Sequence, residues 1–461
     1  MTTVSNVATA VPTVAQPTAL IESLDHEGRG VAHVDGKVIF VEGALPRERV
    51  TYQASRKKKN FETAHLISIQ RESPERVTPK CVYYELCGGC ILQHADYALQ
   101  VAAKQRVLED NLARIGKVAC ERILPPIYAA QWQYRHRARL SVNYVAKKGG
   151  VLVGFRERKS SYVADMKSCE VLAGGVGQMI VPLRELLTTL DIRDRIPQIE
   201  VAVGERTTAL VLRLLDALTP ADEAKLKVFA DQHRIQWWVQ MKGPETAVPF
   251  YPMDAPDLTY TMPEYDLEIL FRPTEFTQVN HAVNRLMVAR AMRLLDPQPG
   301  DKIADLFCGL GNFSLPMARL GAQVIGVEGS ASLTERATEN ARRNSLSWSR
   351  SGGGNSLLAH TTFFPADLYT DQVAAMQRVS GVSKMLIDPP RDGALEVCKL
   401  LGRELRPELK RIVYVSCSPG TLARDAGELV HNQSFKLKAA GVVNMFPHTA
   451  HVESIALFER D

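Results

Sequence analysis

The sequence predicts a multidomain protein in which a β domain precedes two α/β regions. Three observations carry this prediction. The chain has 461 residues, too many for a single hydrophobic core. Short runs of alternating apolar and polar residues fill its first part, as in small barrels. From residue 300 onward, strand and helix patterns alternate, which is typical of a largely parallel sheet flanked by helices.

The composition is that of a globular protein, with 45% hydrophobic and 23% charged residues. Lysine and arginine exceed aspartate and glutamate by 56 to 51, which permits a nucleic-acid partner without requiring one. No apolar stretch approaches the length of a membrane span. Residues 1–15 lack the features of a signal peptide and are expected to form a disordered tail. We therefore expect a cytoplasmic protein whose eight cysteines serve metal binding, catalysis or packing rather than disulfides.

The predicted β-barrel covers residues 16–74. Its strand candidates are Gly30–Val34, Lys37–Val41 and Arg49–Tyr52. The loop Arg56–Phe61 places four basic residues beside an aromatic ring. A solvated charged face and a surface for single-stranded RNA explain this loop equally well.

A helix is predicted at Tyr97–Ile115, and a strand at Thr208–Arg213. The segment Trp132–Tyr144 carries arginines at 135, 137 and 139, which share one face if the segment is a strand. That face suits an RNA backbone, and a salt-bridged sheet surface is an equal alternative. The glycine-rich stretch Ser349–Ser356 is expected to be a loop insertion.

Seven strands are predicted for the C-terminal domain. The last two have no room for a helix between them and should form an antiparallel pair. The candidates are Lys302–Phe307, Ala322–Glu328, Thr361–Phe364, Lys384–Asp388, Arg411–Ser416, Leu437–Phe446 and Val452–Glu459.

A nucleoside site is predicted where the first of these strands ends. The turn Asp305–Asn312 contains two glycines, which allow the backbone to approach a ligand closely. Glu328 follows about 20 residues later, where an acid can accept hydrogen bonds from ribose hydroxyls. The third glycine of a dinucleotide fingerprint is missing, so we favour S-adenosylmethionine (SAM) over NAD. Asp367 would then face the adenine.

Cys417 is the candidate nucleophile. It follows a buried strand directly and precedes Ser418-Pro419-Gly420, so its thiol should point into the ligand crevice of the sheet. Asp388, stiffened by the prolines after it, should enter the same crevice. A thiol beside SAM suits methylation of a pyrimidine at C5, because C5 is unreactive until a nucleophile adds at C6.

Such a reaction needs a base that removes the C5 proton. Candidates are His448, His451 and Glu453, on the approach to the last strand. Glu453 begins an apolar run, where a carboxylate without a function would be costly. A salt-bridged glutamate at a strand end is the alternative reading.

Four further cysteines form a second candidate site. Cys81, Cys87 and Cys90 are close in sequence, whereas Cys169 is solitary. Four thiolates suit a [4Fe–4S] cluster or structural zinc. Zinc sites usually show paired Cys-x2-Cys knuckles, and only one such pair is present, which favours iron–sulfur. Cys120, Cys308 and Cys398 are expected to be packing residues.

Together these motifs resemble the bacterial SAM-dependent RNA uracil-C5 methyltransferases, over nearly the whole chain beyond the tail. The matching segments are Ile21–Gly30, which is similar to a TRAM domain, the cysteines at 81, 87, 90 and 169, and Phe276–Asn280, Asp305–Asn312, Asp388–Arg391, Val415–Cys417, Thr421–Asp425 and Phe446–Glu453.

The resemblance implies three domains. They are an N-terminal OB-like TRAM barrel (residues 16–74), a central α/β iron–sulfur domain (75–92 and 121–270) and a C-terminal Rossmann-like SAM-dependent methyltransferase domain with a seven-stranded sheet (93–120 and 271–461). It further implies that the helical segment within 93–120 packs with the methyltransferase domain.

The resemblance also implies the roles of single residues. Cys417 would be the nucleophile and Glu453 the base, and Cys81, Cys87, Cys90 and Cys169 would hold a [4Fe–4S] cluster. The implied SAM contacts come from Gln278, Phe307, Asn312, Glu328, Asp367 and Asp388. Members that act on transfer RNA lack the barrel and the cluster. The joint presence of barrel and cluster therefore indicates 23S ribosomal RNA as the partner. The enzyme is expected to be a monomer.

Two other functions remain open at this stage. Cytosine-C5 methylation of RNA also uses a cysteine nucleophile. A non-catalytic RNA-binding iron–sulfur protein is the second alternative, although it would have no use for both Cys417 and Glu453.

Overall fold

The computed structural model describes residues 16–350 and 356–461, without the side chains of 346–350. The predicted tail and residues 351–355 of the predicted loop insertion lie outside the described residues, and residues 349 and 350 end helix α6 (Ala331–Arg350) rather than forming a loop. The chain forms two compact units, one ending at residue 78 and including 94–96, the other formed by 79–93 and 97–461. Among the described helices, none has both the length and the apolar character that crossing a bilayer requires.

The first unit is a six-stranded sheet in the order β1-β5-β6-β4-β3-β2. Its strands are β1 (Thr18–Leu20), β2 (Ser23–Leu24), β3 (Gly30–Val34), β4 (Lys37–Glu42), β5 (Arg49–Lys57) and β6 (Phe61–Arg71). The amide of Glu22 donates to the carbonyl of Val31, so the chain leaving β1 closes the sheet onto β3. A side chain at Gly30 would meet Ile21 at 2.8 Å, which explains a glycine at this crossing. The exposed basic loop predicted near Lys58 is the tip of the β5–β6 hairpin.

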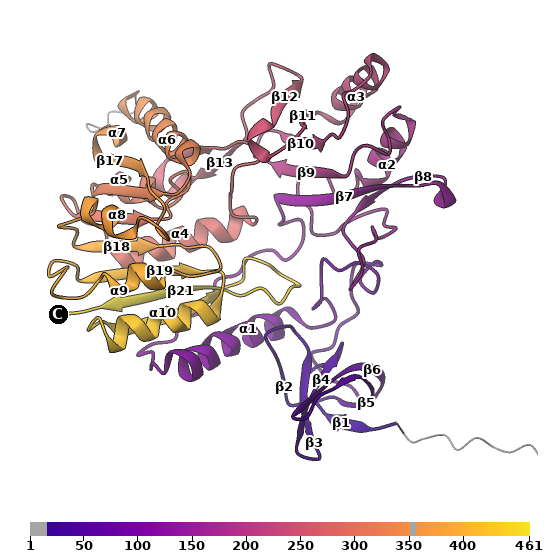
Figure 1. Cartoon of the computed structure of the whole chain (residues 1–461), viewed down its shortest axis with the longest axis horizontal. Helices are drawn as coiled ribbons and strands as arrows, with labels where there is room; N and C mark the ends of the chain where they lie inside the picture. The colour runs from indigo at the N-terminus through magenta and orange to yellow at the C-terminus, as the bar shows by residue number, and fades with distance from the viewer. Residues whose placement is uncertain (1–15, 351–355) are drawn as a thin grey trace, which may run out of the picture. The chain divides into compact units, whose positions relative to one another are not determined.

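The second unit contains a six-stranded sheet in the order β12-β11-β10-β9-β7-β8 (Figure 1). Its elements are β7 (Arg137–Val145), β8 (Gly150–Gly154), α2 (Ile180–Thr189), β9 (Gln198–Val203), β10 (Thr208–Arg213), α3 (Pro220–His233), β11 (Ile235–Gln240) and β12 (Val248–Tyr251). A two-stranded ribbon of β13 (Thr259–Met262) and β14 (Leu267–Leu270) follows.

The predicted arginine face on β7 is largely engaged within the protein. Arg139 lies opposite Glu200 on β9 and forms an ion pair with it at 3.0 Å. Arg137 donates to the carbonyls of Pro273 and Glu275. Arg135 precedes the strand. These contacts agree with the salt-bridged interpretation of this face, but the Arg139 side chain is 67% exposed, so RNA binding by this face stays a prediction.

A seven-stranded sheet follows, in the order β17-β16-β15-β18-β19-β21-β20 (Figure 1). The first five strands pair in parallel, and β21 is antiparallel to both of its neighbours. The strands are β15 (Lys302–Leu306), β16 (Gln323–Glu328), β17 (Thr361–Pro365), β18 (Lys384–Ile387), β19 (Arg411–Ser416), β20 (Lys436–Val443) and β21 (Glu453–Glu459).

Helices cover both faces of this sheet because its central strands are apolar on both sides. One face carries α4 (His281–Leu295), α5 (Ser314–Arg319) and α6 (Ala331–Arg350), whose apolar side chains pack with Leu386 and Val413. The other carries α1 (Tyr97–Asn111), α8 (Gln372–Arg378), α9 (Leu395–Lys399) and α10 (Pro419–His431), packed on Met385 and Ile412. A short α7 (Leu357–His360) precedes β17.

Helix α1 lies far from the sheet in sequence but shares its core. Val107 and Leu108 belong to the same buried cluster as Leu422 and Phe458. The helix continues as a π-helical turn, Leu112–Gly116, which also packs there. The predicted helix is thus present, and it adds a layer to the seven-stranded sheet.

Candidate active site

Six of the eight predicted catalytic and SAM-binding residues lie along one edge of the seven-stranded sheet. Glu328 ends a strand there, Glu453 begins one, and the other four follow one. In sheet order they are Asp367, Glu328, Phe307, Asp388, Cys417 and Glu453. Open α/β sheets bind ligands in the crevice outside the carboxyl ends of their strands, where the strand order reverses. That reversal falls between β15 and β18, beside Phe307 and Asp388.

Strand register brings Cys417 and Glu453 together. Ser416 on β19 pairs with Ser454 on β21, the last pair of the ladder. One step further along an antiparallel pair, Cys417 falls opposite Glu453. Directly opposed residues have Cβ atoms about 5 Å apart. A 36-residue separation in sequence is thus closed by the sheet.

Burial and like charge perturb both groups. Glu453 is only 3% exposed, and burial together with the charge of Asp388 raises its pKa to about 8. Cys417 is half-buried, and burial followed by the charges of Glu453 and Asp388 raises its pKa to about 11. Arg391 acts in the opposite direction on both. Because the charges of Asp388 and Arg391 act on both Cys417 and Glu453, these four side chains form one cluster.

The centre of this edge is acidic and incompletely satisfied. Burial raises the pKa values of Asp305 and Asp388 to about 7. Asp305 is fully buried; its Oδ2 accepts from the Ser314 hydroxyl, but its Oδ1 has no hydrogen-bond partner among the residues that the structure describes. A cationic ligand would compensate these carboxylates, whereas a pyrophosphate would be repelled. The arrangement therefore fits the cationic SAM better than NAD.

The turn after β15 has the conformation that a closely approaching ligand needs. Gly311 adopts φ +95°, which a side chain would strain. Phe307 adopts φ +62°, an unusual conformation for a bulky residue that often marks a functional site. Glu328 accepts hydrogen bonds from the amides of Gly309 and Ser330 at 3.1 and 3.0 Å. The acid predicted for ribose is thus held against the glycine turn.

The remaining predicted SAM contacts differ in their accessibility. Asp367 is exposed, and the amide of Tyr369 donates to its carboxylate at 2.8 Å, which lowers its pKa. Gln278 is buried, two residues before Asn280 caps α4. The side-chain oxygen of Asn312 accepts hydrogen bonds from the Tyr260 hydroxyl at 2.8 Å and from the side-chain amide of Asn284 at 2.9 Å. Gln278 and Asn312 lie off the row of strand ends.

The structure separates the three candidate bases. His448 is buried, and both of its ring nitrogens face protein partners, Gln100 and the carbonyl of Gln131. Burial lowers its pKa to about 4. His451 is exposed and lies 3.5 Å from the Arg391 guanidinium. Of the three, Glu453 is the one whose charge acts on the Cys417 thiol.

Sequence reasoning missed the roles of Arg391 and Lys104. Arg391 lies within the predicted Asp388–Arg391 loop, but its place in the sequence gives no sign that its charge acts on Cys417 and Glu453. Lys104 is 2% exposed and donates to Asn444 Oδ1 at 2.6 Å and to the carbonyl of Phe446 at 2.8 Å. The sequence does contain a signal for its burial. Lys104 lies four residues after Gln100 and four before the buried Leu108, on the apolar face of the predicted helix.

The four outer cysteines lie close enough to interact. Cys87 and Cys90 each raise the pKa of Cys169, and Cys81 raises the pKa of Cys87 and of Cys90. Burial is the largest cause of the shift in each case. The amide of Gly89 donates to Cys87 Sγ at 3.4 Å. Amide donors of this kind stabilise thiolates. The four thiols are thus linked electrostatically, directly or through one another.

The cysteines are nevertheless not arranged around a single ion. Within residues 16–350 and 356–461, no group of three or more His, Cys, Asp or Glu side chains forms a site that could hold a metal ion. Four thiolates on one zinc would lie about 3.8 Å apart, given Zn–S bonds of about 2.3 Å. A four-iron cube spaces its cysteines more widely, because each binds a different iron.

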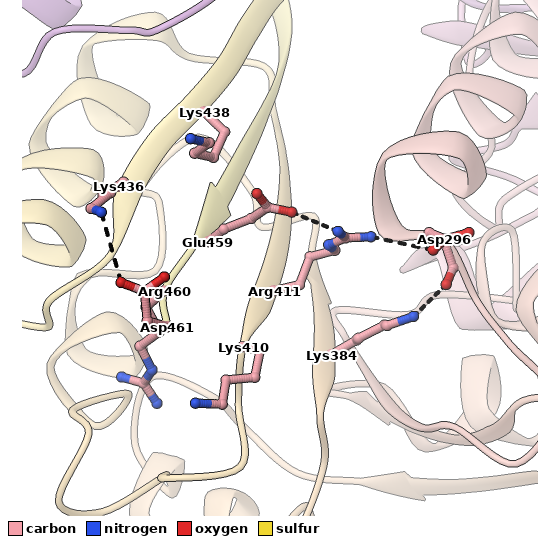
Figure 2. A pocket seen from close by; sticks show the side chains of 9 residues that line it. All are labelled: Asp296, Lys384, Lys410, Arg411, Lys436, Lys438, Glu459, Arg460 and Asp461. Atoms are coloured by element: carbon pink, nitrogen blue, oxygen red, sulfur yellow. Dashed lines mark hydrogen bonds and ion pairs between the residues drawn. The ribbon is translucent and has the colours of Figure 1, made fainter.

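A cavity of about 350 Å³ lies at the opposite edge of the sheet, where β18, β19 and β20 begin (Figure 2). Its cations are largely paired. Arg411 bridges Glu459 at 2.7 Å and Asp296 at 3.6 Å, and Lys384 binds Asp301 at 2.7 Å. The cavity contains none of the predicted site residues and lies at the wrong ends of the strands for the ligand crevice.

Comparison with known proteins agrees with this geometry. A family model described as tRNA (Uracil-5-)-methyltransferase matches residues 253–461, and a TRAM domain model matches residues 17–67. The 23S rRNA (uracil(1939)-C(5))-methyltransferase RlmD of Nitrosospira multiformis is 58% identical over 442 residues, covering 96% of this chain and 98% of the relative. The chain belongs to the RlmD family.

Other members of the RlmD family are similarly close. RlmD of Burkholderia pseudomallei is 55% identical over 455 residues, covering 96% of this chain and 95% of the relative. Among solved structures, the Pyrococcus abyssi tRNA (uracil-54, C5)-methyltransferase in complex with S-adenosyl-L-homocysteine superimposes with a TM-score of 0.69 at 24% identity. It covers 96% of this chain and all of that chain, which confirms the methyltransferase fold.

Proposed function

We propose that this member of the RlmD family transfers the methyl group of SAM to C5 of a uridine in 23S ribosomal RNA. Its relatives carry that activity in their names, and the TRAM domain offers an RNA-binding module. The observation that carries the proposal is the opposition of Cys417 and Glu453 across the end of the β19–β21 ladder. A nucleophile and a base on either side of one substrate atom are what this methylation requires.

The reaction begins at Cys417. Its thiol releases a proton to water, and the thiolate adds to C6 of the uracil, so that the C5=C6 electrons move onto O4 as an enolate. SAM supplies an electrophilic methyl group at this point, and C5 takes it. Glu453 then removes the C5 proton, the enolate re-forms, and the C5=C6 bond returns as the Cys417 sulfur leaves. The net products are 5-methyluridine, S-adenosylhomocysteine and one proton.

The surrounding side chains have defined tasks in this scheme. The raised pKa of Glu453 makes it a stronger base than an exposed carboxylate. Arg391, the cation that favours the ionised forms of Cys417 and Glu453, opposes their mutual repulsion. Gln278, Phe307, Asn312, Glu328, Asp367 and Asp388 would contact SAM. The target uridine must be unstacked to reach the thiol.

The test is methyl transfer from labelled SAM to a 23S rRNA fragment. Cys417→Ala should abolish incorporation while leaving the SAM dissociation constant within about twofold of wild type. Cys120→Ala, which removes a half-buried thiol elsewhere, is the matched control and should retain activity. Turnover by Cys417→Ala would refute the covalent mechanism. A transcript with cytidine at the target position should not be methylated, and methylation of it would favour the cytosine alternative.

We further propose that Cys81, Cys87, Cys90 and Cys169 hold a [4Fe–4S] cluster, in a central domain formed by residues 75–92 and 121–270. The electrostatic effects of Cys81 on Cys87 and Cys90, the effects of Cys87 and Cys90 on Cys169, and the amide donor to Cys87 support this assignment. Anaerobically purified protein should contain about four iron and four sulfide per chain and absorb visible light. Stoichiometric zinc with no colour would refute the cluster.

A further inference from the structure

The loop between β20 and β21 delivers Glu453 to the site, yet it is held mainly by segments far upstream in the chain. The amide of Asn444 donates to the carbonyl of Ile127 at 2.7 Å. Lys104 of α1 donates to Asn444 Oδ1 and to the carbonyl of Phe446. The Tyr134 hydroxyl donates to the carbonyl of Pro447 at 3.0 Å. The position of this loop therefore depends on residues outside β20 and β21.

His448 is the most heavily bonded residue of this loop. Its amide donates to Gln100 Oε1 at 2.8 Å, and its carbonyl accepts from the amides of Ile91 and Leu92 at 2.9 and 3.0 Å. Its ring stacks on Trp132 with centroids 4.1 Å apart. Nε2 donates to the carbonyl of Gln131 at 3.0 Å, which leaves Nδ1 to accept from Gln100.

The backbone of His448 is also unusual. Its φ is +65°, a conformation that a histidine adopts at a cost and keeps only when its surroundings impose it. Five residues later the chain enters β21 at Glu453. His448 therefore determines the direction in which the chain approaches the base.

The two amides that donate to the carbonyl of His448 belong to the segment 81–92, called here the cysteine segment because it carries Cys81, Cys87 and Cys90. Ile91 follows Cys90 directly, and the Tyr84 hydroxyl donates to its carbonyl at 2.5 Å. Arg158 donates to the carbonyl of Cys90 at 2.9 Å and stacks on Tyr84 at 4.5 Å. The segment that carries Cys87 and Cys90 is thus fixed on one side by Arg158, and on the other it holds His448.

We propose that His448 is a positioning residue that couples the cysteine segment to Glu453, so that a change at Cys81, Cys87 or Cys90 displaces the base without disturbing SAM. The inference rests on the proposed function, since Glu453 is taken as the base. It goes beyond the proposed function because it links the cysteine segment to the position of Glu453. His448 itself takes no proton from the substrate, because both ring nitrogens are occupied.

The first test compares two identical substitutions. His448→Asn keeps a residue that tolerates positive φ but loses the ring stack and the bond to Gln131. His431→Asn removes a comparable bond, 3.0 Å from Nε2 to the carbonyl of Gly116, on the far end of α10. We expect kcat for His448→Asn to fall 10- to 100-fold, with SAM affinity within twofold and covalent RNA adduct accumulating. A merely destabilised protein would lose adduct and SAM binding in parallel.

Tyr134→Phe provides a second variant if His448→Asn folds poorly. It removes the hydroxyl that donates to the carbonyl of Pro447 and keeps the ring, and it should give the same pattern with a smaller fall in kcat. If both variants match His431→Asn, the proposal is wrong.

The coupling itself is measured by hydrogen exchange, which needs no activity. Cys90→Ser should speed amide exchange across residues 446–452, and it should add little when His448→Asn is already present. Additive effects, or no effect on this loop, would overturn the coupling. Wild-type protein that fails to methylate RNA would instead refute the proposed function and leave the exchange result standing.

Discussion

The two edges of the seven-stranded sheet treat charge in opposite ways. At the edge where β18, β19 and β20 begin, Arg411 and Lys384 have acidic partners within 4 Å (Figure 2). At the other edge, Asp388, Glu453 and Cys417 are crowded together, with Arg391 as the cation that acts on both Cys417 and Glu453. The same strands thus present mostly paired charges at one end and a crowded acidic crevice at the other.

This difference indicates where the protein gives up stability for function. Paired surface charges contribute little to stability but cost little to maintain. Buried carboxylates that repel one another are destabilising, and they persist where chemistry or a ligand requires them. The crowded carboxylates at one edge and the ion pairs at the other therefore favour the first edge as the candidate active site, on grounds other than sequence similarity.

Removing the base should have the largest effect. Glu453→Gln keeps the shape of the side chain but cannot accept the C5 proton, so steady-state methylation should fall by about 10²- to 10⁴-fold. The methylated RNA should then remain attached to Cys417. A denaturing gel with labelled RNA measures this adduct. If Glu453→Gln forms no adduct although Cys417 still reacts with the RNA, another group must be the base.

Two arginines test the contrast between the edges directly. Arg391→Ala should raise the pKa values of Cys417 and Glu453 further and slow single-turnover methylation by about tenfold at pH 7.5, as one pKa unit corresponds to a factor of ten. Arg411→Ala, the matched control, loses ion pairs at the opposite edge and should keep its rate within about twofold. Equal losses from the two variants would contradict the assignment of function to one edge.

Glu453→Gln should also change stability, in a direction that depends on pH. The folded protein binds the Glu453 proton up to a pKa of about 8, whereas the unfolded chain releases it near 4.3. Burial of Glu453 therefore costs no stability below about pH 4.3, where both states are protonated, and the free energy of unfolding falls as the pH rises toward 8. Glu453→Gln should match wild type at pH 4.5 and exceed it by a few kcal/mol at pH 8. Thermal denaturation at the two pH values measures this difference.

The opposite edge should show the smallest effect. Lys410 lines the basic cavity, and no hydrogen bond or ion pair of its side chain is found within the described residues. Lys410→Ala should therefore change the free energy of unfolding by less than about 0.5 kcal/mol and leave methylation unaltered. A marked loss of RNA binding would show that this cavity belongs to the substrate surface after all.

Much of the C-terminal architecture was accessible from the sequence because each strand carries its own local signal. The apolar run before Cys417 and the short link between the last two strands predicted the thiol at a strand end and the antiparallel pairing. Both are confirmed. Strand ends in a parallel sheet share one edge, so the predicted positions of Glu328, Phe307 and Asp388 followed as well.

Register and side-chain partners could not be predicted, because they depend on contacts between distant segments. The sequence offered His448, His451 and Glu453 as bases, and only the pairing of Ser416 with Ser454 places Glu453 opposite Cys417. The arginines at 137 and 139 had the spacing of a basic face, but Glu200 and two carbonyls engage them. Likewise, nothing near Lys104 in sequence reveals its partners 340 residues away.

The most direct test of the account uses an RNA in which 5-fluorouridine replaces the target uridine. Fluorine cannot leave C5 as a proton does, so the enzyme should stop after methyl transfer with RNA bound through sulfur. Peptide mass spectrometry should find one nucleotide and one methyl group on Cys417, and none in Cys417→Ala. Methylation of ordinary RNA without any such adduct, or an adduct on another residue, would contradict the account.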